Sequence, residues 1–344
     1  MGTEAPGTLP QEASGPAEPA PGTLRDRRIP NNVFGISFGI AGLAGSWSAA
    51  RPILGTSTAV ANTLYILAAA IWLVSLVLYT AQGLRRIIVD LHNQALGSFT
   101  SVAFITPMLV SSALAPYALD AARTLVAVFL ALTVLLGAWM TGQWIVEPID
   151  ADSANPSYFL PAAAGGLVGG FAAAQVGMHA VAEASFGLGI LCWIFFGAPL
   201  YGRLFFRPMM PTPLLPALAI ELAPPAVAGV AYFALSKGKI DTFATALAGF
   251  AVLMALVQVR LVPLYTKLHF SPTMWAFTFP YAAAASDALL WIRAKQPAGA
   301  TAYAAVTVGL ITFFIGTIAA FTIAALVRRT FLPKPAPEAR SVGQ

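Results

Sequence analysis

Ten long apolar blocks dominate this sequence and restrict the folds available to it. Each block is about as long as the ~20 residues that an α-helix needs to cross a bilayer. Only 10% of the 344 residues are charged, whereas a soluble domain usually carries roughly a quarter. We therefore expect an all-α polytopic membrane protein. The ten predicted spans are 32–49, 58–82, 97–117, 119–142, 158–178, 181–202, 213–235, 240–259, 271–291 and 302–326.

The two ends of the chain differ from this apolar middle. Residues 1–29 are rich in Pro, Gly, Ala and Glu, and residues 331–344 have a similar composition. Such segments lack the apolar residues needed to form a core, and the N-terminal one has no apolar run typical of a signal peptide. We predict two disordered tails, 1–29 and 331–344, around one transmembrane domain, 30–330.

The basic residues between the spans predict the orientation. Cytoplasmic loops of membrane proteins carry an excess of Lys and Arg. A cytoplasmic N-terminus leaves only six of the 19 Lys and Arg on the outer face. We therefore predict a multi-pass protein of the plasma or inner membrane, with both termini in the cytoplasm. The six outer residues are Arg51, Arg123, Lys237, Lys239, Arg293 and Lys295.

Gly and Pro gather in the odd-numbered spans, and they recur early in each one. The predicted breaks are at Gly39, Pro107, Pro161, Pro216 and Pro280. A recurrence about every 60 residues suggests repeated helical pairs. We predict five quasi-repeated helical hairpins, each with one bent and one smooth helix, around a central pore.

Small residues recur at helical spacing on one face of each odd span. Five such faces meeting at an axis would leave a narrow lumen lined by methyl groups, hydroxyls and backbone. The alternative is close helix packing, because Gly35/Gly39 and Gly165/Gly169 have the GxxxG spacing. The predicted pore-lining residues are Gly35, Gly39, Gly42, Thr106, Pro107, Ser111, Gly165, Gly169, Ala217, Pro224, Ala276, Ala283 and Ser286.

Few ionisable side chains lie inside the spans. Glu221 is near the middle of the seventh span, where a charge costs ~2.5 kcal/mol or more to insert. We expect it to be protonated, or paired off the axis, with either an anchoring or a proton-coupling role. Asp241 and Asp287 lie nearer to span ends, where we expect interfacial water to solvate them.

The sequence offers no pattern typical of an enzyme or a metal protein. The three histidines have no partners at metal-ligand spacing, and Cys192 is the single cysteine. No Walker loop is present, and the basic residues form no continuous face for nucleic acid. We expect no catalytic activity, no metal, no cofactor and no nucleic-acid partner.

Three motifs are similar to a known transporter family. VFGISFGIAGLAGSW (33–47), LAPPAVA (222–228) and MWAFTFPYAAA (274–284) resemble the tellurite-resistance/dicarboxylate transporter family, whose relatives include slow-type anion channels of plant guard cells. The resemblance implies ten helices as five hairpins around a pore, and a homotrimer with one pore per protomer. It also implies a phenylalanine in the ninth helix that blocks the pore. Motif position assigns this role to Phe279, with Phe277 as the alternative.

The family includes anion channels, carriers of malate and other dicarboxylates, and sulfite exporters. A lumen with few fixed acids, in a protein of net charge +5, does not repel anions. We expect basic residues at the cytoplasmic mouth, among them Arg85, Arg86 and Arg207, to concentrate them. We predict transport of small inorganic or carboxylate anions through the bilayer. The alternative is a proton-coupled carrier or exporter of C4-dicarboxylate, sulfite or tellurite-type oxyanions.

Overall fold

A computed structural model describes residues 29–332, and every regular element in this range is helical. Eight helical segments are long and apolar enough to cross a membrane. The prediction of an all-α, multi-pass membrane protein is therefore confirmed. The predicted tails lie almost entirely outside the described residues. The α-helices are α1 (Phe34–Leu54), α2 (Ala59–Thr80), α3 (Leu84–Leu91), α4 (Val102–Ser112), α5 (Leu119–Val146), α6 (Gly165–Gln175), α7 (His179–Phe206), α8 (Ala223–Leu235), α9 (Thr242–Tyr265), α10 (Thr278–Lys295) and α11 (Ala300–Val327).

Two of the predicted spans are helical but are not among these eight segments, because one is too short and the other carries several charged residues. The segment Gly97–Ser112 is apolar but short, because the chain leaves the helix five residues before the predicted end at 117. The helix α10 carries Asp287, Arg293 and Lys295 within its 18 residues. A ten-span arrangement therefore stays a prediction at this point.

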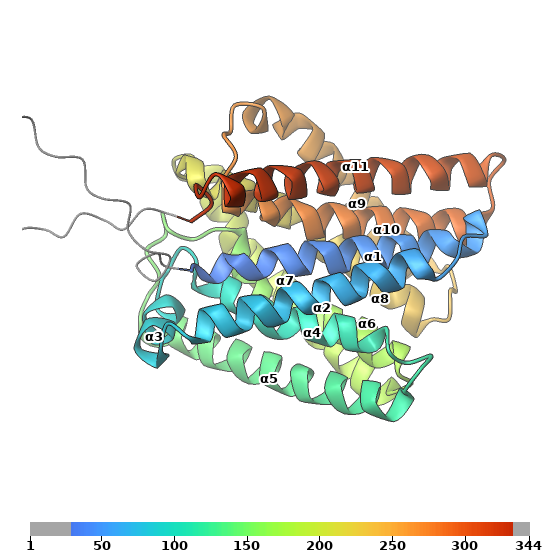
Figure 1. The fold of residues 1–344 in the computed structure, drawn as a ribbon, viewed down its shortest axis with the longest axis horizontal. Coiled ribbons are helices and arrows are strands. Elements are labelled where there is room, and N and C mark those ends of the chain that lie inside the picture. Colours follow the sequence, from blue (N-terminus) through green and yellow to red (C-terminus); the bar gives the residue numbers. More distant parts are fainter. Residues whose placement is uncertain (1–28, 333–344) are drawn as a thin grey trace, which may run out of the picture. The chain divides into compact units, whose positions relative to one another are not determined.

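The helices fall into an inner and an outer set. The inner helices α1, α4, α6, α8 and α10 contact one another in chain order, and α10 also contacts α1. The outer helices α2, α5, α7, α9 and α11 each pack on at least one inner helix. The segments that contain α6 and α8 are 83% and 89% buried, whereas α2 and α9 are each 17% buried. Figure 1 shows the start of α1 and the end of α11 at the same end of the described unit.

Each inner helix follows a short irregular helix. Five of these have 3-10 geometry and one has π geometry; they are η2 (Asn31–Val33), η3 (Gly97–Ser101), η4 (Pro156–Phe159), the π-helix η5 (Leu160–Ala164), η6 (Thr212–Leu222) and η7 (Pro272–Phe277). Proline explains much of this geometry, because it lacks an N–H and disfavours α conformation in the residue before it. Pro161 and Pro216 lie inside irregular turns, as predicted. The breaks predicted at Gly39, Pro107 and Pro280 are wrong, since all three residues lie within regular α-helix and the irregular turns precede them.

Several glycines mark places where two helices touch. A Cβ on Gly166 of α6 would lie 2.6 Å from the backbone nitrogen of Gly189 in α7. A Cβ on Gly39 of α1 would collide with the Thr278 hydroxyl of α10. Only glycine permits such close approach of backbones. These contacts favour the packing interpretation of the GxxxG spacings.

The helix α3 was not predicted from the sequence. It has only eight residues, which is too short to span a bilayer. It begins after Gly83, whose φ of 90° turns the chain sharply after α2. The Tyr79 hydroxyl donates to Asp90 Oδ2 at 3.0 Å and ties α3 back to α2.

Candidate functional site

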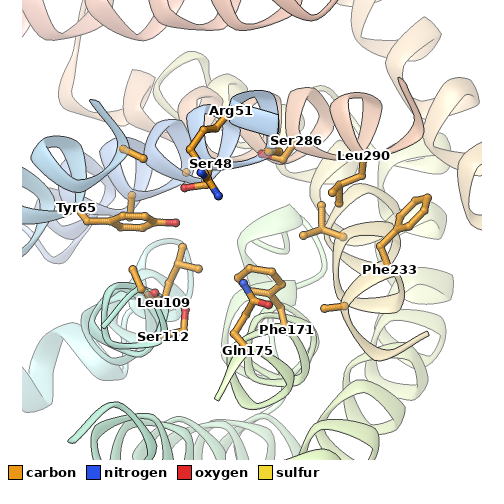
Figure 2. A pocket seen from close by; sticks show the side chains of 18 of the residues that line it. Ser48, Arg51, Tyr65, Leu109, Ser112, Phe171, Gln175, Phe233, Ser286 and Leu290 are labelled. Atoms are coloured by element: carbon orange, nitrogen blue, oxygen red, sulfur yellow. Dashed lines mark hydrogen bonds between the residues drawn. The ribbon is translucent and has the colours of Figure 1, made fainter. Parts of the chain in front are cut away.

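A cavity of about 930 Å³ lies between the inner helices. Its lining comes from α1, α4, α6, α8 and α10, the ends of these helices included, together with α2. Figure 2 shows side chains from these helices, including Tyr65, Ser112, Phe171 and Gln175, pointing into a common space. The hydroxyl and amide groups that line it are those of Ser48, Thr58, Asn62, Tyr65, Ser112, Tyr117, Gln175 and Ser286.

Two stacked aromatic rings lie at one end of this cavity. On α10 the lining runs from Phe279, in the first turn, to Arg293 near the C-terminus. The Phe279 ring stacks on Phe38 of α1, with centroids 3.5 Å apart and planes 13° apart. A Cβ on Gly42 would lie 3.0 Å from the Phe279 ring. The small residue at position 42 therefore leaves room for this ring between α1 and α10.

Phe277, the alternative to Phe279, lies in a different environment. It is buried but does not line the cavity. Its ring packs edge-on against Tyr265 of α9 and Phe314 of α11, and it is tilted against Tyr281. Phe277 therefore joins an inner segment to two outer helices, whereas Phe279 faces the cavity.

The other end of the cavity is positively charged. Arg51, Lys237 and Arg293 line it and are exposed. None of the described residues that line the cavity is Asp or Glu. The three cations follow or end inner helices, where the negative end of each helix dipole favours a positive side chain. This end therefore attracts anions.

These cations were not predicted as site residues. All three were expected on the outer face, whereas the residues expected to concentrate anions lie at the opposite mouth. All three follow odd-numbered predicted spans, and this shared position in the sequence could have identified them as residues of the cavity. Phe38 was also missed, although it lies inside the motif at 33–47.

Four residues of the predicted site line the cavity: Gly42, Phe279, Ala283 and Ser286. The Ser286 hydroxyl is 3.0 Å from that of Ser46, which joins α10 to α1. The remaining predicted lining residues are absent from the cavity wall; they are Gly35, Gly39, Thr106, Pro107, Ser111, Gly165, Gly169, Ala217, Pro224 and Ala276.

The predicted lining positions on α6 face an outer helix. A Cβ on Gly165 would meet Thr133 of α5, and one on Gly169 would meet Leu130, at 2.5 Å and 2.6 Å. These glycines therefore let α5 approach α6 closely. Their role in lining a pore stays a prediction.

Glu221 is buried in η6 and lies outside the cavity wall. Neither carboxylate oxygen has a hydrogen-bond partner among the described residues. Tyr201 of α7 is the neighbouring hydroxyl, and it donates to Met254 Sδ at 3.3 Å. No group of three His, Cys, Asp or Glu that could hold a metal ion occurs in the part of the chain that is described.

The two aspartates near span ends differ. Asp241 precedes α9, is partly exposed, and accepts bonds from the Ala244 N–H and the Tyr232 hydroxyl. Asp287 is only 5% exposed, and its carboxylate packs directly against Gly229 of α8. The prediction that interfacial water solvates Asp287 is therefore wrong, because α8 covers it.

Comparison with known proteins agrees with this architecture. The family model described as voltage-dependent anion channel (SLAC1) matches residues 28–327. The tellurite resistance protein TehA homolog of Haemophilus influenzae is 27% identical over 311 residues, which cover 89% of this chain and 93% of that protein. The match includes all of α1 to α11. The chain therefore belongs to the SLAC1/TehA family of membrane anion transporters, as its three sequence motifs predicted.

Proposed function

We propose that this chain conducts small anions through a pore along the axis of its inner helices, and that Phe279 blocks this pore. The observation that carries the proposal is the cavity of about 930 Å³, which has three cations and no described carboxylate in its wall and ends at the Phe279–Phe38 stack. An anion entering past Arg51, Lys237 and Arg293 would meet hydroxyl and amide groups and then an apolar ring.

The inferred arrangement is ten membrane-spanning helices in five hairpins, with the inner helix of each hairpin facing the pore. The contacts among the inner helices support it, and so does the buried state of α1, α6 and α8. The homotrimer is inferred from the family resemblance, and the plasma or inner membrane with cytoplasmic termini from the basic residues. In that orientation the cavity opens to the outer face.

The neutral polar groups in the cavity wall favour passage of an anion over its tight binding. Neutral hydroxyl and amide donors, such as Ser48, Ser112 and Gln175, replace part of an anion's hydration shell without holding it tightly. Conduction requires that an ion also leaves, so weak binding at several points is favourable. The Phe279 ring presents no donor and excludes water from the narrowest point.

Anion flux in proteoliposomes tests the proposal. We would compare the wild-type protein with Phe279→Ala for chloride, nitrate, malate and sulfite, without a proton gradient. Phe277→Ala is the matched control, because it removes the same ring from an adjacent position outside the cavity. Higher flux of several anions in Phe279→Ala alone supports a blocked channel. Equal effects of the two variants, or lower flux of one anion in Phe279→Ala, contradicts the assigned block.

The second candidate is a proton-coupled carrier of dicarboxylate, sulfite or tellurite-type oxyanions. The name of the Haemophilus relative mentions tellurite resistance. One observation favours it: Glu221 is buried, forms no ion pair among the described residues, and has the Tyr201 hydroxyl beside its carboxylate. A coupling role predicts that Glu221→Gln flattens the dependence of transport on pH. An unchanged pH profile, with normal folding, excludes Glu221 as the coupling group.

A further inference from the structure

A second cavity lies at the opposite end of the helices from the basic end of the first. It has a volume of about 320 Å³ and is formed by the C-terminal ends of α5 and α7, the connection 147–155 and Tyr158. Its wall is mostly aromatic and aliphatic: Trp144 is 4.7 Å from Tyr158 and 5.9 Å from Phe196 between ring centroids, and Leu200 completes this side. Such a slot accommodates an apolar chain.

Arg203 contributes a buried positive charge to this cavity. The residue is only 6% exposed. Its Nη2 donates to the backbone carbonyl of Asp152 at 3.2 Å, but its buried Nε has no partner. No carboxylate among residues 29–332 forms an ion pair with it. A buried cation without a counter-charge is costly, which indicates that an anion completes this site.

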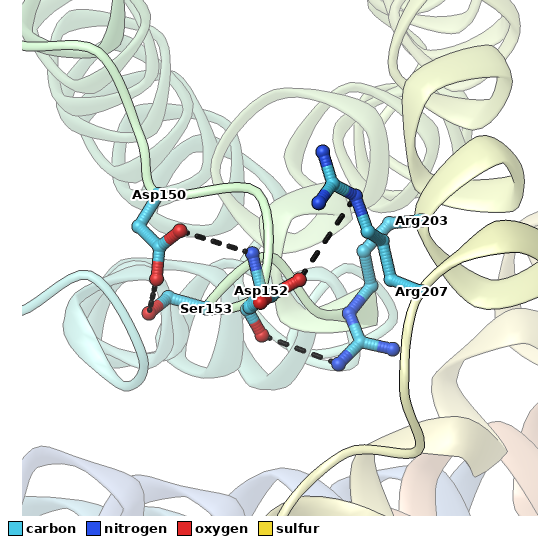
Figure 3. Close-up of polar contacts among 5 residues, drawn as sticks. All are labelled: Asp150, Asp152, Ser153, Arg203 and Arg207. Atoms are coloured by element: carbon cyan, nitrogen blue, oxygen red, sulfur yellow. Dashed lines mark hydrogen bonds and ion pairs between the residues drawn. The ribbon is translucent and has the colours of Figure 1, made fainter.

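Arg207, one helical turn further on, lines the same cavity. Its Nε is 4.0 Å from Asp152 Oδ1, and both side chains are 55% exposed. The neighbouring Asp150 carboxylate instead accepts bonds from the Asp152 N–H and the Ser153 hydroxyl. Figure 3 shows both arginines reaching toward the 150–153 turn, with Asp152 as their shared contact. The Arg207 guanidinium thus faces a loosely held carboxylate, while the Arg203 guanidinium faces the backbone carbonyl of the same residue.

The surface around the arginines is apolar. Ile145 and Val146 end α5, Phe205 and Phe206 end α7, and each of these side chains is at least 71% exposed. Large exposed apolar side chains beside arginines are typical of the boundary between lipid tails and headgroups. A freely soluble anion would gain nothing from this surface or from the aromatic slot.

We propose that this cavity binds an anionic phospholipid. The phosphate oxygens accept hydrogen bonds from Arg203 Nε and from the Arg207 guanidinium, and one acyl chain lies along Trp144 and Phe196. Arginine suits this role because its planar group donates two parallel hydrogen bonds to a phosphate. The wall of this cavity shares no residue with that of the first cavity. The lipid proposal therefore does not depend on the anion conduction proposed for the first cavity.

The test uses the purified full-length protein in detergent after removal of bound lipid. We would measure bound molecules by native mass spectrometry, and the unfolding temperature, with three probes: phosphatidylglycerol, phosphatidylcholine and inorganic phosphate. Arg203→Gln/Arg207→Gln removes the phosphate ligands. Arg260→Gln is its matched control, because Arg260 is exposed on α9 outside the cavity.

A second pair of variants fills the slot and keeps both arginines. Gly202 lines the cavity, and no atom lies within 4 Å of a Cβ built there. Gly202→Leu therefore leaves the helix packing intact while it occupies the space of the acyl chain. Gly142→Leu on α5 is the matched control, because a Cβ there also meets nothing and the residue does not line the cavity.

We expect phosphatidylglycerol to bind and to raise the unfolding temperature more than phosphatidylcholine, with no effect of inorganic phosphate. Loss of charge-assisted hydrogen bonds in the double Gln variant should weaken binding about tenfold or more. Gly202→Leu should weaken it while both controls bind normally. Equal effects of inorganic phosphate and phosphatidylglycerol, or wild-type lipid binding by Gly202→Leu, would overturn the proposal. Equal binding of the two lipids would also overturn it.

Discussion

The inner and outer helices reverse the usual relation between hydropathy and burial. In a water-soluble protein the most apolar helices are buried. Here α2 and α9 are more apolar than the segments containing α6 and α8, yet they are far more exposed. The lipid tails surround the outer helices and replace the protein core as their apolar environment. Small residues and prolines, not hydropathy, therefore distinguish the inner helices.

The largest expected effect is on the free energy of unfolding. It distinguishes Phe277, which lies between the inner and outer helices, from Phe313, which lies on the lipid-facing side of α11. Phe277 packs against rings of α9 and α11, whereas Phe313 of α11 is 75% exposed. We expect Phe277→Ala to lower the free energy of unfolding by about 3 kcal/mol, because it leaves a cavity. Phe313→Ala should change it little, since lipid fills the space. Thermal or denaturant unfolding in one lipid mixture measures both, and equal losses would contradict the assignment of α11's outer face to lipid.

Glycines provide the second test of the difference between the two sets. A Cβ at Gly166 would press on the backbone of Gly189, while a Cβ at Gly309 of α11 meets nothing within 4 Å. Gly166→Ala should lower the free energy of unfolding by about 2 kcal/mol through overpacking. Gly309→Ala should leave it unchanged or raise it by up to about 1 kcal/mol, because alanine favours helix. Unfolding temperatures compare the pair. A tolerated Gly166→Ala would mean that α6 and α7 are less close than described.

The sequence predicted the helical class because it depends on local patterns. A long apolar run predicts a membrane span, and a proline predicts an irregular turn, as at Pro161 and Pro216. It did not predict which small residues face the cavity. Gly42 and Gly165 look alike in sequence, but one lies beside Phe279 and the other beside Thr133. That distinction depends on the rotation of each helix within the ring, which only the packing of ten segments determines.

The buried charges were the least predictable feature. Arg203 lies near the end of α7, and Asp287 was expected near the end of its predicted span, where water usually solvates ionic groups. In the structure Asp287 is in the middle of α10, and the two residues are only 6% and 5% exposed. Their burial arises from tertiary neighbours. Residues of α5 and of the connection 147–155 lie around Arg203, and α8 packs against Asp287 at Gly229. The position of a residue along its helix does not show whether a neighbouring helix buries its side chain.

The cations at the cavity entrance predict a smaller, salt-dependent effect. Arg51→Gln/Arg293→Gln should lower anion flux several-fold at ~0.01 M salt, because it weakens the electrostatic attraction of anions to the entrance. The reduction should shrink at ~1 M salt, where screening acts over about 3 Å. Flux is measured in the Phe279→Ala background. Lys239→Gln/Lys295→Gln is the matched control, since neither residue lines the cavity. A reduction independent of salt would exclude electrostatic attraction as its cause.

The smallest expected effect concerns Asp241, which joins an outer to an inner helix. Its carboxylate accepts bonds from the Tyr232 hydroxyl of α8 at 2.5 Å and from the Ala244 N–H of α9 at 3.0 Å. The Tyr232 bond, followed by that N–H, lowers the pKa of Asp241 below its ordinary value of 3.8. A lowered pKa stabilises the fold above the ordinary value, and this contribution is lost as the pH falls through the lowered one.

Asp241→Asn keeps a helix cap but cannot ionise. The wild-type protein should therefore unfold at a slightly higher temperature than Asp241→Asn at neutral pH. This difference should disappear as the pH falls below the lowered pKa of Asp241, where its carboxylate becomes protonated. Tyr232→Phe should reduce the difference, because it removes the largest cause of the pKa shift. A difference that persists unchanged at acid pH would mean that the Asn variant is destabilised by its shape and not by its missing charge. In that case the contact between α8 and α9 at this point depends on packing alone.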